Sequence, residues 1–148
     1  MLTFDANIYA YPTTATVGDS VVIRGESLTP LCDAERRPPI FDAFLPVTFE
    51  QAYEALVQLP RLDAEPDGFL VIAGEADGSR WQLDGHLYDF GDSLHRLRLH
   101  GQCPDETLDA VLQCLGWPEA QVAFEVISDG VVLDESNFRR YAARRPIH

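Results

Sequence analysis

The fold of this chain is decided by residues 68–103, GFLVIAGEADGSRWQLDGHLYDFGDSLHRLRLHGQC, which carry its longest alternation of apolar and polar residues. Such alternation is typical of strands that bury one face. Asp77-Gly78 is a two-residue hairpin signal, because both positions of a type I′ turn need a positive φ. Gly91-Asp92 marks a second turn. The stretch therefore predicts a three-stranded antiparallel meander.

The register of this meander follows from its own apolar pattern, since a slip of one residue would turn every side chain to the opposite face. A two-residue loop at 77 and 78 pairs Ala76 with Ser79. In the second hairpin, inward-facing Leu87 meets inward-facing Leu97 if the loop has three residues, 91–93. The same register pairs Gly74 with Trp81, Ile72 with Leu83, Leu70 with Gly85, and Gly85 with Leu99.

Three helices and a further strand are expected after residue 47. Thr48 and Gln51 form a capping box, and apolar residues at helical spacing follow it. The expected helices lie near 48–59, 105–115 and 134–143, and the strand lies near 122–127 and ends at an Asp129-Gly130 turn. Helices set against a mainly antiparallel sheet predict an α+β two-layer sandwich.

The chain is expected to form a single domain, 1–148, which is an ordinary length for one hydrophobic core. Residues 1–47 show weaker patterning. Short strands are predicted at 7–11 and 20–25, and prolines predict an extended loop at 26–46. We expect this N-terminal segment to pack on or wrap the 48–148 core. An acidic loop, 63–67, leads into the meander.

The net charge of −13 comes from 24 acidic residues against 11 basic ones, all of them arginine. The lack of lysine is compatible with a GC-rich bacterial genome. An acidic surface repels phosphate backbones and anionic membranes, so no nucleic-acid or membrane partner is expected. A basic protein is its natural complement, although the acidity also has a simpler interpretation as a source of solubility.

The sequence favours a cytoplasmic location. Its N-terminus lacks a basic region followed by an apolar run, and no segment reaches the roughly 20 apolar residues of a membrane span. Cys32, Cys103 and Cys114 are odd in number and lack C-x-x-C spacing. They therefore predict reduced thiols, with neither a disulfide framework nor a structural zinc site.

The face of the meander opposite its apolar side is the candidate site. Its cross-strand pairs are Phe69 with His86, Val71 with Asp84, Asp84 with His100, His86 with Arg98, and Tyr88 with Arg96. Aromatic and arginine side chains are enriched at interface hot spots, so this set predicts a protein-binding face. Two alternatives stay open: a solvated face with weak cross-strand pairs, or a face that the N-terminal segment covers.

Catalysis is the second hypothesis. Asp84, His86 and His100 are the residue types of an open catalytic metal site, but the two histidines are diagonal neighbours and a fourth ligand is lacking, so no metal and no cofactor are expected. Cys103, just before a predicted helix, would be reactive if the helix N-terminus lowered its pKa. A small buried thiol is the alternative.

The expected function is therefore that of a non-catalytic protein-binding module. An acidic inhibitor or immunity-type protein that neutralises a basic toxin or nuclease is one concrete form of it, because such inhibitors use fast electrostatic association. The alternative is a small enzyme or ligand-binding domain that uses Asp84, His86, His100 and Cys103. The sequence also leaves open a homodimer.

Overall fold

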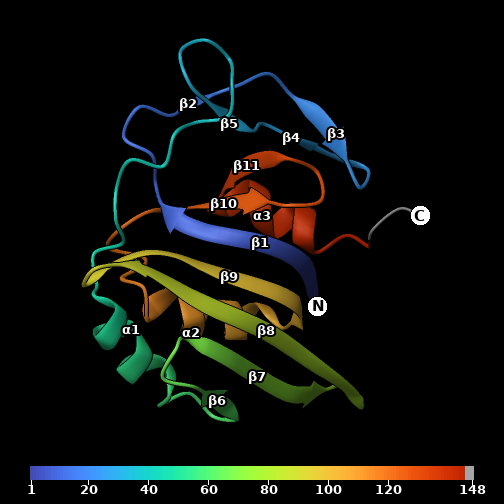
Figure 1. Cartoon of the computed structure of the whole chain (residues 1–148). Coiled ribbons are helices and arrows are strands. Elements are labelled where there is room, and N and C mark those ends of the chain that lie inside the picture. The colour runs from blue at the N-terminus through green and yellow to red at the C-terminus, as the bar shows by residue number, and fades with distance from the viewer. Residues whose placement is uncertain (146–148) are drawn as a thin grey trace.

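The computed structural model describes residues 1–145, and within them three helices cover one face of a seven-stranded antiparallel sheet (Figure 1). The strands of this sheet are β1 (Leu2–Ala10), β6 (Leu62–Ala64), β7 (Phe69–Ala76), β8 (Ser79–Phe90), β9 (Ser93–Cys103), β10 (Val122–Val126) and β11 (Val131–Asp134). The helices are α1 (Phe49–Leu56), α2 (Asp105–Gln113) and α3 (Glu135–Ala142). The predicted α+β two-layer sandwich is confirmed, and the strand order is β11-β10-β1-β9-β8-β7-β6.

The predicted register of the meander is confirmed along most of its length. Ala76 pairs with Ser79 across the first turn, and Leu87 pairs with Leu97 in the second hairpin. The three-residue loop predicted at 91–93 is wrong. Ser93 pairs with Phe90, so the turn has two residues, and a register shift next to Tyr88 leaves His95 as an extra residue in β9. A β-bulge of this kind restores the inward register that a longer loop was expected to provide.

Strand β1 lies in the middle of the sheet, between β9 and β10. It is longer than the strand expected at 7–11 and starts at Leu2. Its apolar residues alternate, so that Leu2, Phe4, Ala6 and Ile8 are buried against the helices. Pairing with β1 places β10 in the same sheet as the meander.

Two edge strands lie where the sequence predicted no strand. Leu62–Ala64, at the start of the predicted acidic loop, forms β6 and pairs with β7. The predicted turn at Asp129-Gly130 is present, and β11 follows it and pairs with β10. Both strands are short, which is common at sheet edges because a short edge limits pairing with other chains.

The helices begin where their capping residues predict. At α1, the Thr48 hydroxyl accepts a hydrogen bond from the Gln51 amide, and the Gln51 side chain accepts one from the Thr48 amide. At α3, the Asp134 carboxylate accepts a hydrogen bond from the Asn137 amide. Pro104 precedes α2, and acidic residues in its first turn suit the positive end of the helix dipole.

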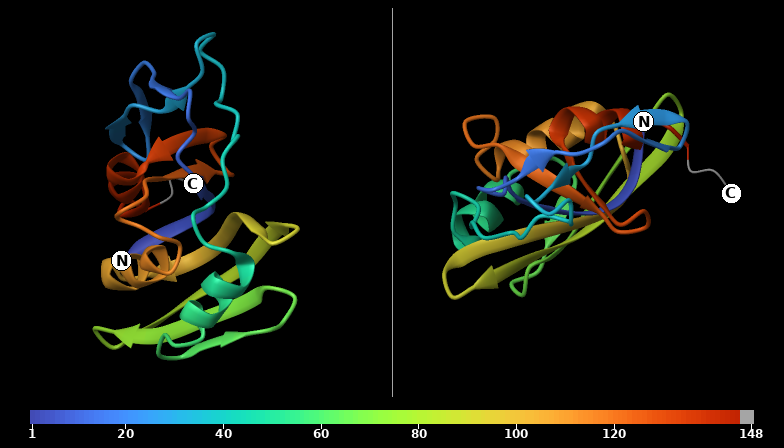
Figure 2. Two further views of the ribbon diagram at one scale, coloured as in Figure 1. Left: turned by 90° about the vertical axis from the view of Figure 1, so that its left-hand side faces the viewer. Right: turned by 90° about the horizontal axis from the view of Figure 1, so that it is seen from above.

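Residues 12–47 form two small ribbons near β11 and an extended connection that runs from these ribbons back along the sheet to α1 (Figure 2). The ribbons pair β2 (Thr16–Val17) with β5 (Leu31–Cys32), and β3 (Val21–Ile23) with β4 (Glu26–Leu28). The loop predicted at 26–46 therefore contains β4 and β5.

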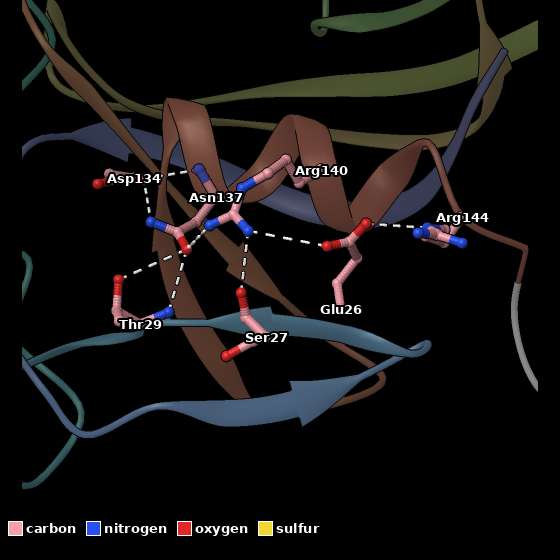
Figure 3. A network of polar contacts seen from close by, with 7 residues as sticks. All are labelled: Glu26, Ser27, Thr29, Asp134, Asn137, Arg140 and Arg144. Carbon is pink, nitrogen blue, oxygen red and sulfur yellow. Dashed lines mark hydrogen bonds and ion pairs between the residues drawn. The ribbon is translucent and has the colours of Figure 1, made fainter.

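The β3–β4 ribbon is attached to α3 by a polar network centred on Asn137 (Figure 3). The Asn137 side chain is buried, and its oxygen accepts hydrogen bonds from the Thr29 amide at 3.0 Å and from Arg140 at 2.8 Å. Its amide nitrogen donates to Asp134 at 2.9 Å. Arg140 also donates to the Ser27 carbonyl. The amide of Asn137 thus joins the ribbon to the helix layer.

Candidate functional site

The candidate site is the face of β7, β8 and β9 that points away from the helices. We call it the open face and define it by Phe69, Val71, Asp84, His86, Tyr88, Arg96, Arg98 and His100. All five predicted cross-strand pairs of these residues are present in the register. Paired residues of neighbouring strands point to the same side of a sheet, so the eight side chains share one surface.

The open face is accessible. None of its eight residues is buried. Phe69 is 41% exposed to solvent, although its side chain is large and apolar. The alternative in which the N-terminal segment covers these strands is therefore wrong for the meander. The N-terminal segment instead covers the neighbouring strand β1 on the same side of the sheet. There, Phe41 stacks on Tyr9 with ring centroids 3.6 Å apart.

Arg98 is fixed by a residue that the sequence prediction missed. Its guanidinium donates two hydrogen bonds to the Asp5 carboxylate, at 3.2 Å and 3.0 Å. This two-pronged geometry restricts the arginine more than a single contact does, and the bonds raise its pKa. The apolar alternation of residues 2–8 was the available signal, since it places Asp5 on the polar side of a strand.

Tyr88 lies at the centre of a stack of flat groups. The Arg96 guanidinium carbon lies 4.0 Å from the centre of the Tyr88 ring, and the His86 ring lies 4.6 Å from it on a tilted plane. A cation over an aromatic face contributes about 0.5–1 kcal/mol at exposed sites. The stack therefore holds side chains that would otherwise be mobile on a half-exposed surface.

A shallow hollow of about 300 Å³ lies within the open face. Its side chains are Phe69, Asp84, His86, Tyr88, Arg98 and His100. This volume is at the lower end of the range for small-molecule sites. The three residues considered for metal binding therefore share one hollow, but within residues 1–145 no three His, Cys, Asp or Glu side chains are grouped closely enough to hold a metal ion. Asp84 instead accepts a hydrogen bond from Gln82 at 2.8 Å.

Cys103 does not have the lowered pKa considered for a reactive thiol. It is buried on the helix side of the sheet, where desolvation and then the nearby Asp105 charge raise its pKa to about 12. Burial outweighs the helix N-terminus because a thiolate loses its hydration there. The interpretation of Cys103 as a small core residue fits this position.

The bulge next to the open face places His95 among aromatic rings. The Tyr9 ring lies 5.2 Å from it, and the exposed rings of Phe44 and Phe90 lie 6.2 and 6.4 Å away. Burial and then the neighbouring Arg96 lower the pKa of His95, which favours its neutral form. Sequence patterning missed this group because it depends on the extra residue in β9.

Comparisons with protein-family models, with curated proteins and with solved structures gave no match. Within residues 1–145, no helix has both the length and the apolar character that crossing a membrane requires. The function is therefore argued from the surface of the molecule itself.

Proposed function

We propose that this chain is a non-catalytic cytoplasmic protein-binding module that binds a basic partner protein through its open face. The observation that carries the proposal is the accessibility of that face, on which Phe69, Tyr88 and Arg98 are presented by long paired strands. Tyrosine and arginine are enriched among residues that dominate binding energy, and rigid strands reduce the entropy lost when they bind.

The distribution of charge supports a basic partner. Residues 48–103, which span α1 and the meander, contain ten of the 24 acidic residues and four of the 11 arginines, Arg61, Arg80, Arg96 and Arg98. None of the ion pairs formed within residues 1–145 involves any of these ten acidic residues. The arginines near α3, in contrast, neutralise carboxylates around them. A basic protein would therefore be steered towards the end of the molecule formed by α1 and the meander.

An inhibitor or immunity-type protein is the concrete form that we favour. Rapid electrostatic association suits a protein that must neutralise a basic toxin or nuclease before it acts. The three free thiols are compatible with a reducing compartment.

The first experiment identifies the partner and then maps the surface. The tagged chain captures proteins from its native host, and mass spectrometry identifies them. Tyr88→Ala and Arg98→Ala are each expected to weaken binding of the captured protein by about 2 kcal/mol if these residues are hot spots. Binding is measured by calorimetry and folding by thermal unfolding.

Gln113→Ala is the matched control, because Gln113 is exposed on α2 in the opposite layer. It should leave binding unchanged. A loss of affinity as large in the control as in Tyr88→Ala, or a loss explained by unfolding, would rule out the open face as the binding surface.

The hollow in the open face favours one alternative, a small enzyme or ligand-binding domain that uses Asp84, His86 and His100. On that hypothesis, His100→Ala abolishes turnover of a substrate, whereas Tyr88→Ala changes its affinity. Screening metabolite mixtures by ligand-observed NMR distinguishes the two functions, since a protein-binding face retains no small molecule there.

A further inference from the structure

A second hollow lies between α1 and the turn that joins β8 to β9. The Phe49 amide donates a hydrogen bond to the Asp92 carbonyl at 3.3 Å, and Thr48 forms an isolated bridge with Ser93. These contacts fix the start of the helix against the hairpin, next to each other at one end of the sheet (Figure 1). The hollow beside them has a volume of about 590 Å³, which is within the range of ligand-binding sites.

One side of this hollow is aromatic. Phe49 and Tyr53 lie one helical turn apart, with ring planes inclined by 13° and centroids 6.3 Å apart. Both side chains are half-buried, and Pro66 continues the apolar surface across the hollow. Aromatic rings that line a hollow can bind a flat or cationic group through their faces.

The rim of the hollow is acidic. Glu50, Asp89 and Asp92 line it and are exposed, and no basic side chain lines it. Within the described residues 1–145, these three carboxylates form neither ion pairs nor side-chain hydrogen bonds. They are therefore free to receive a cation.

An anion is a poor fit at this helix N-terminus. The Gln51 amide donates to the Thr48 hydroxyl, and the Phe49 amide donates to the Asp92 carbonyl, so amides that commonly bind anions have partners. Three carboxylates would also repel a phosphate or carboxylate group. The charge and the aromatic wall together select a cation with an apolar or planar surface.

We propose that this hollow receives an arginine side chain of the basic partner. The guanidinium would stack on the Phe49 and Tyr53 rings and donate hydrogen bonds to the rim carboxylates, while its methylene stem contacts Pro66. Arginine fits better than lysine because its planar group stacks on rings and binds carboxylates in two-pronged fashion. This inference rests on the proposed function and adds a second contact surface to the open face.

The test uses the full chain and a defined probe, the peptide acetyl-Gly-Arg-Gly-amide. Amide chemical shifts of ¹⁵N-labelled protein are followed by NMR during titration. We expect the shifts to concentrate at residues 48–53, 66 and 89–92. The same peptide with citrulline, which is neutral but similar in shape, should bind at least about tenfold more weakly, because it cannot form charge-assisted hydrogen bonds.

Two matched triple variants separate the site from the overall charge. E50Q/D89N/D92N removes the three rim charges and should weaken binding of the arginine peptide about tenfold. E35Q/E106Q/E119Q removes three exposed charges elsewhere and should change it less than about twofold. Thermal unfolding shows whether each variant folds. If the rim triple does not fold, Asp89→Asn alone replaces it, since Asp89 is exposed on the hairpin.

Equal weakening by both triples, equal binding of the citrulline peptide, or shifts spread over the surface would overturn the inference. If the peptide fails to bind at the hollow but the captured basic protein still binds through Tyr88 and Arg98, only this inference fails. If the peptide binds at the hollow but no basic protein binds the chain, the proposed function fails and the hollow stands as a guanidinium site.

Discussion

Replacing Asn137 with alanine is expected to detach the β3–β4 ribbon from α3. Three hydrogen bonds of the side chain are lost, those from the Thr29 amide and Arg140 and that to Asp134. The Thr29 amide is only half-buried, and Arg140 is about half exposed, so the cost is smaller than for a fully buried network. Alanine also has a higher helix propensity than asparagine, which offsets a few tenths of a kcal/mol of the lost stability.

The net loss should be about 2 kcal/mol of unfolding free energy, or about 4–8 °C in the unfolding midpoint for a chain of this length. Urea and thermal unfolding followed by circular dichroism measure this change. Thr29→Val is the control, because the Thr29 hydroxyl lies 3.5 Å from the Asn137 oxygen while its amide keeps the main contact. It should cost less than about 0.5 kcal/mol.

Hydrogen exchange adds a local measurement to this prediction. The Thr29 amide should exchange faster in Asn137→Ala, because its acceptor is gone and the ribbon opens more readily. An Asn137→Ala variant as stable as the native chain, or a Thr29→Val variant that is equally destabilised, would refute the role assigned to the Asn137 side chain.

Two further predictions concern the sheet. Gly101→Ala should cost about 3 kcal/mol or more, because φ is +132° and a Cβ would lie 2.1 Å from the Gln82 carbonyl oxygen. Gly130→Ala is the control, because Gly130 also has a positive φ, +66°, but has open space around it, and this variant should lose only about 1 kcal/mol of unfolding free energy. Equal losses for the two variants in urea unfolding would contradict the steric clash at Gly101. At pH 8, Cys103 should react with a thiol reagent after Cys32, because Cys103 is buried and its desolvation raises its pKa to about 12. Peptide mapping by mass spectrometry that finds Cys103 modified first would contradict its burial.

Sequence patterning predicted the meander because alternation and turn residues are local properties. The pairings of Ala76 with Ser79 and of Leu87 with Leu97 follow from them directly. The turn at 91–93 was mispredicted because an apolar pattern fixes how many residues separate two inward positions, not where the extra residue lies. A bulge at His95 satisfies the same count as a longer loop.

The remaining differences arise from contacts between distant segments. Residues 2–8 alternate, but only their pairing with β9 and β10 makes β1 a central strand. That placement brings Asp5 to Arg98, a pair separated by 93 residues. The hollow beside α1 depends on the position of the helix against the hairpin, so the spacing of Phe49 and Tyr53 indicated only a helix face. Local patterns do not specify such packing.

The most direct test of electrostatically steered binding is the association rate of the captured partner at different salt concentrations. Between about 50 mM and about 500 mM salt, we expect the association rate constant to fall at least about tenfold while the dissociation rate changes less, because salt screens charges beyond the Debye length. Stopped-flow fluorescence of the two Trp residues measures both rates. An association rate that does not change with salt would contradict the claim that the acidic surface selects a basic partner.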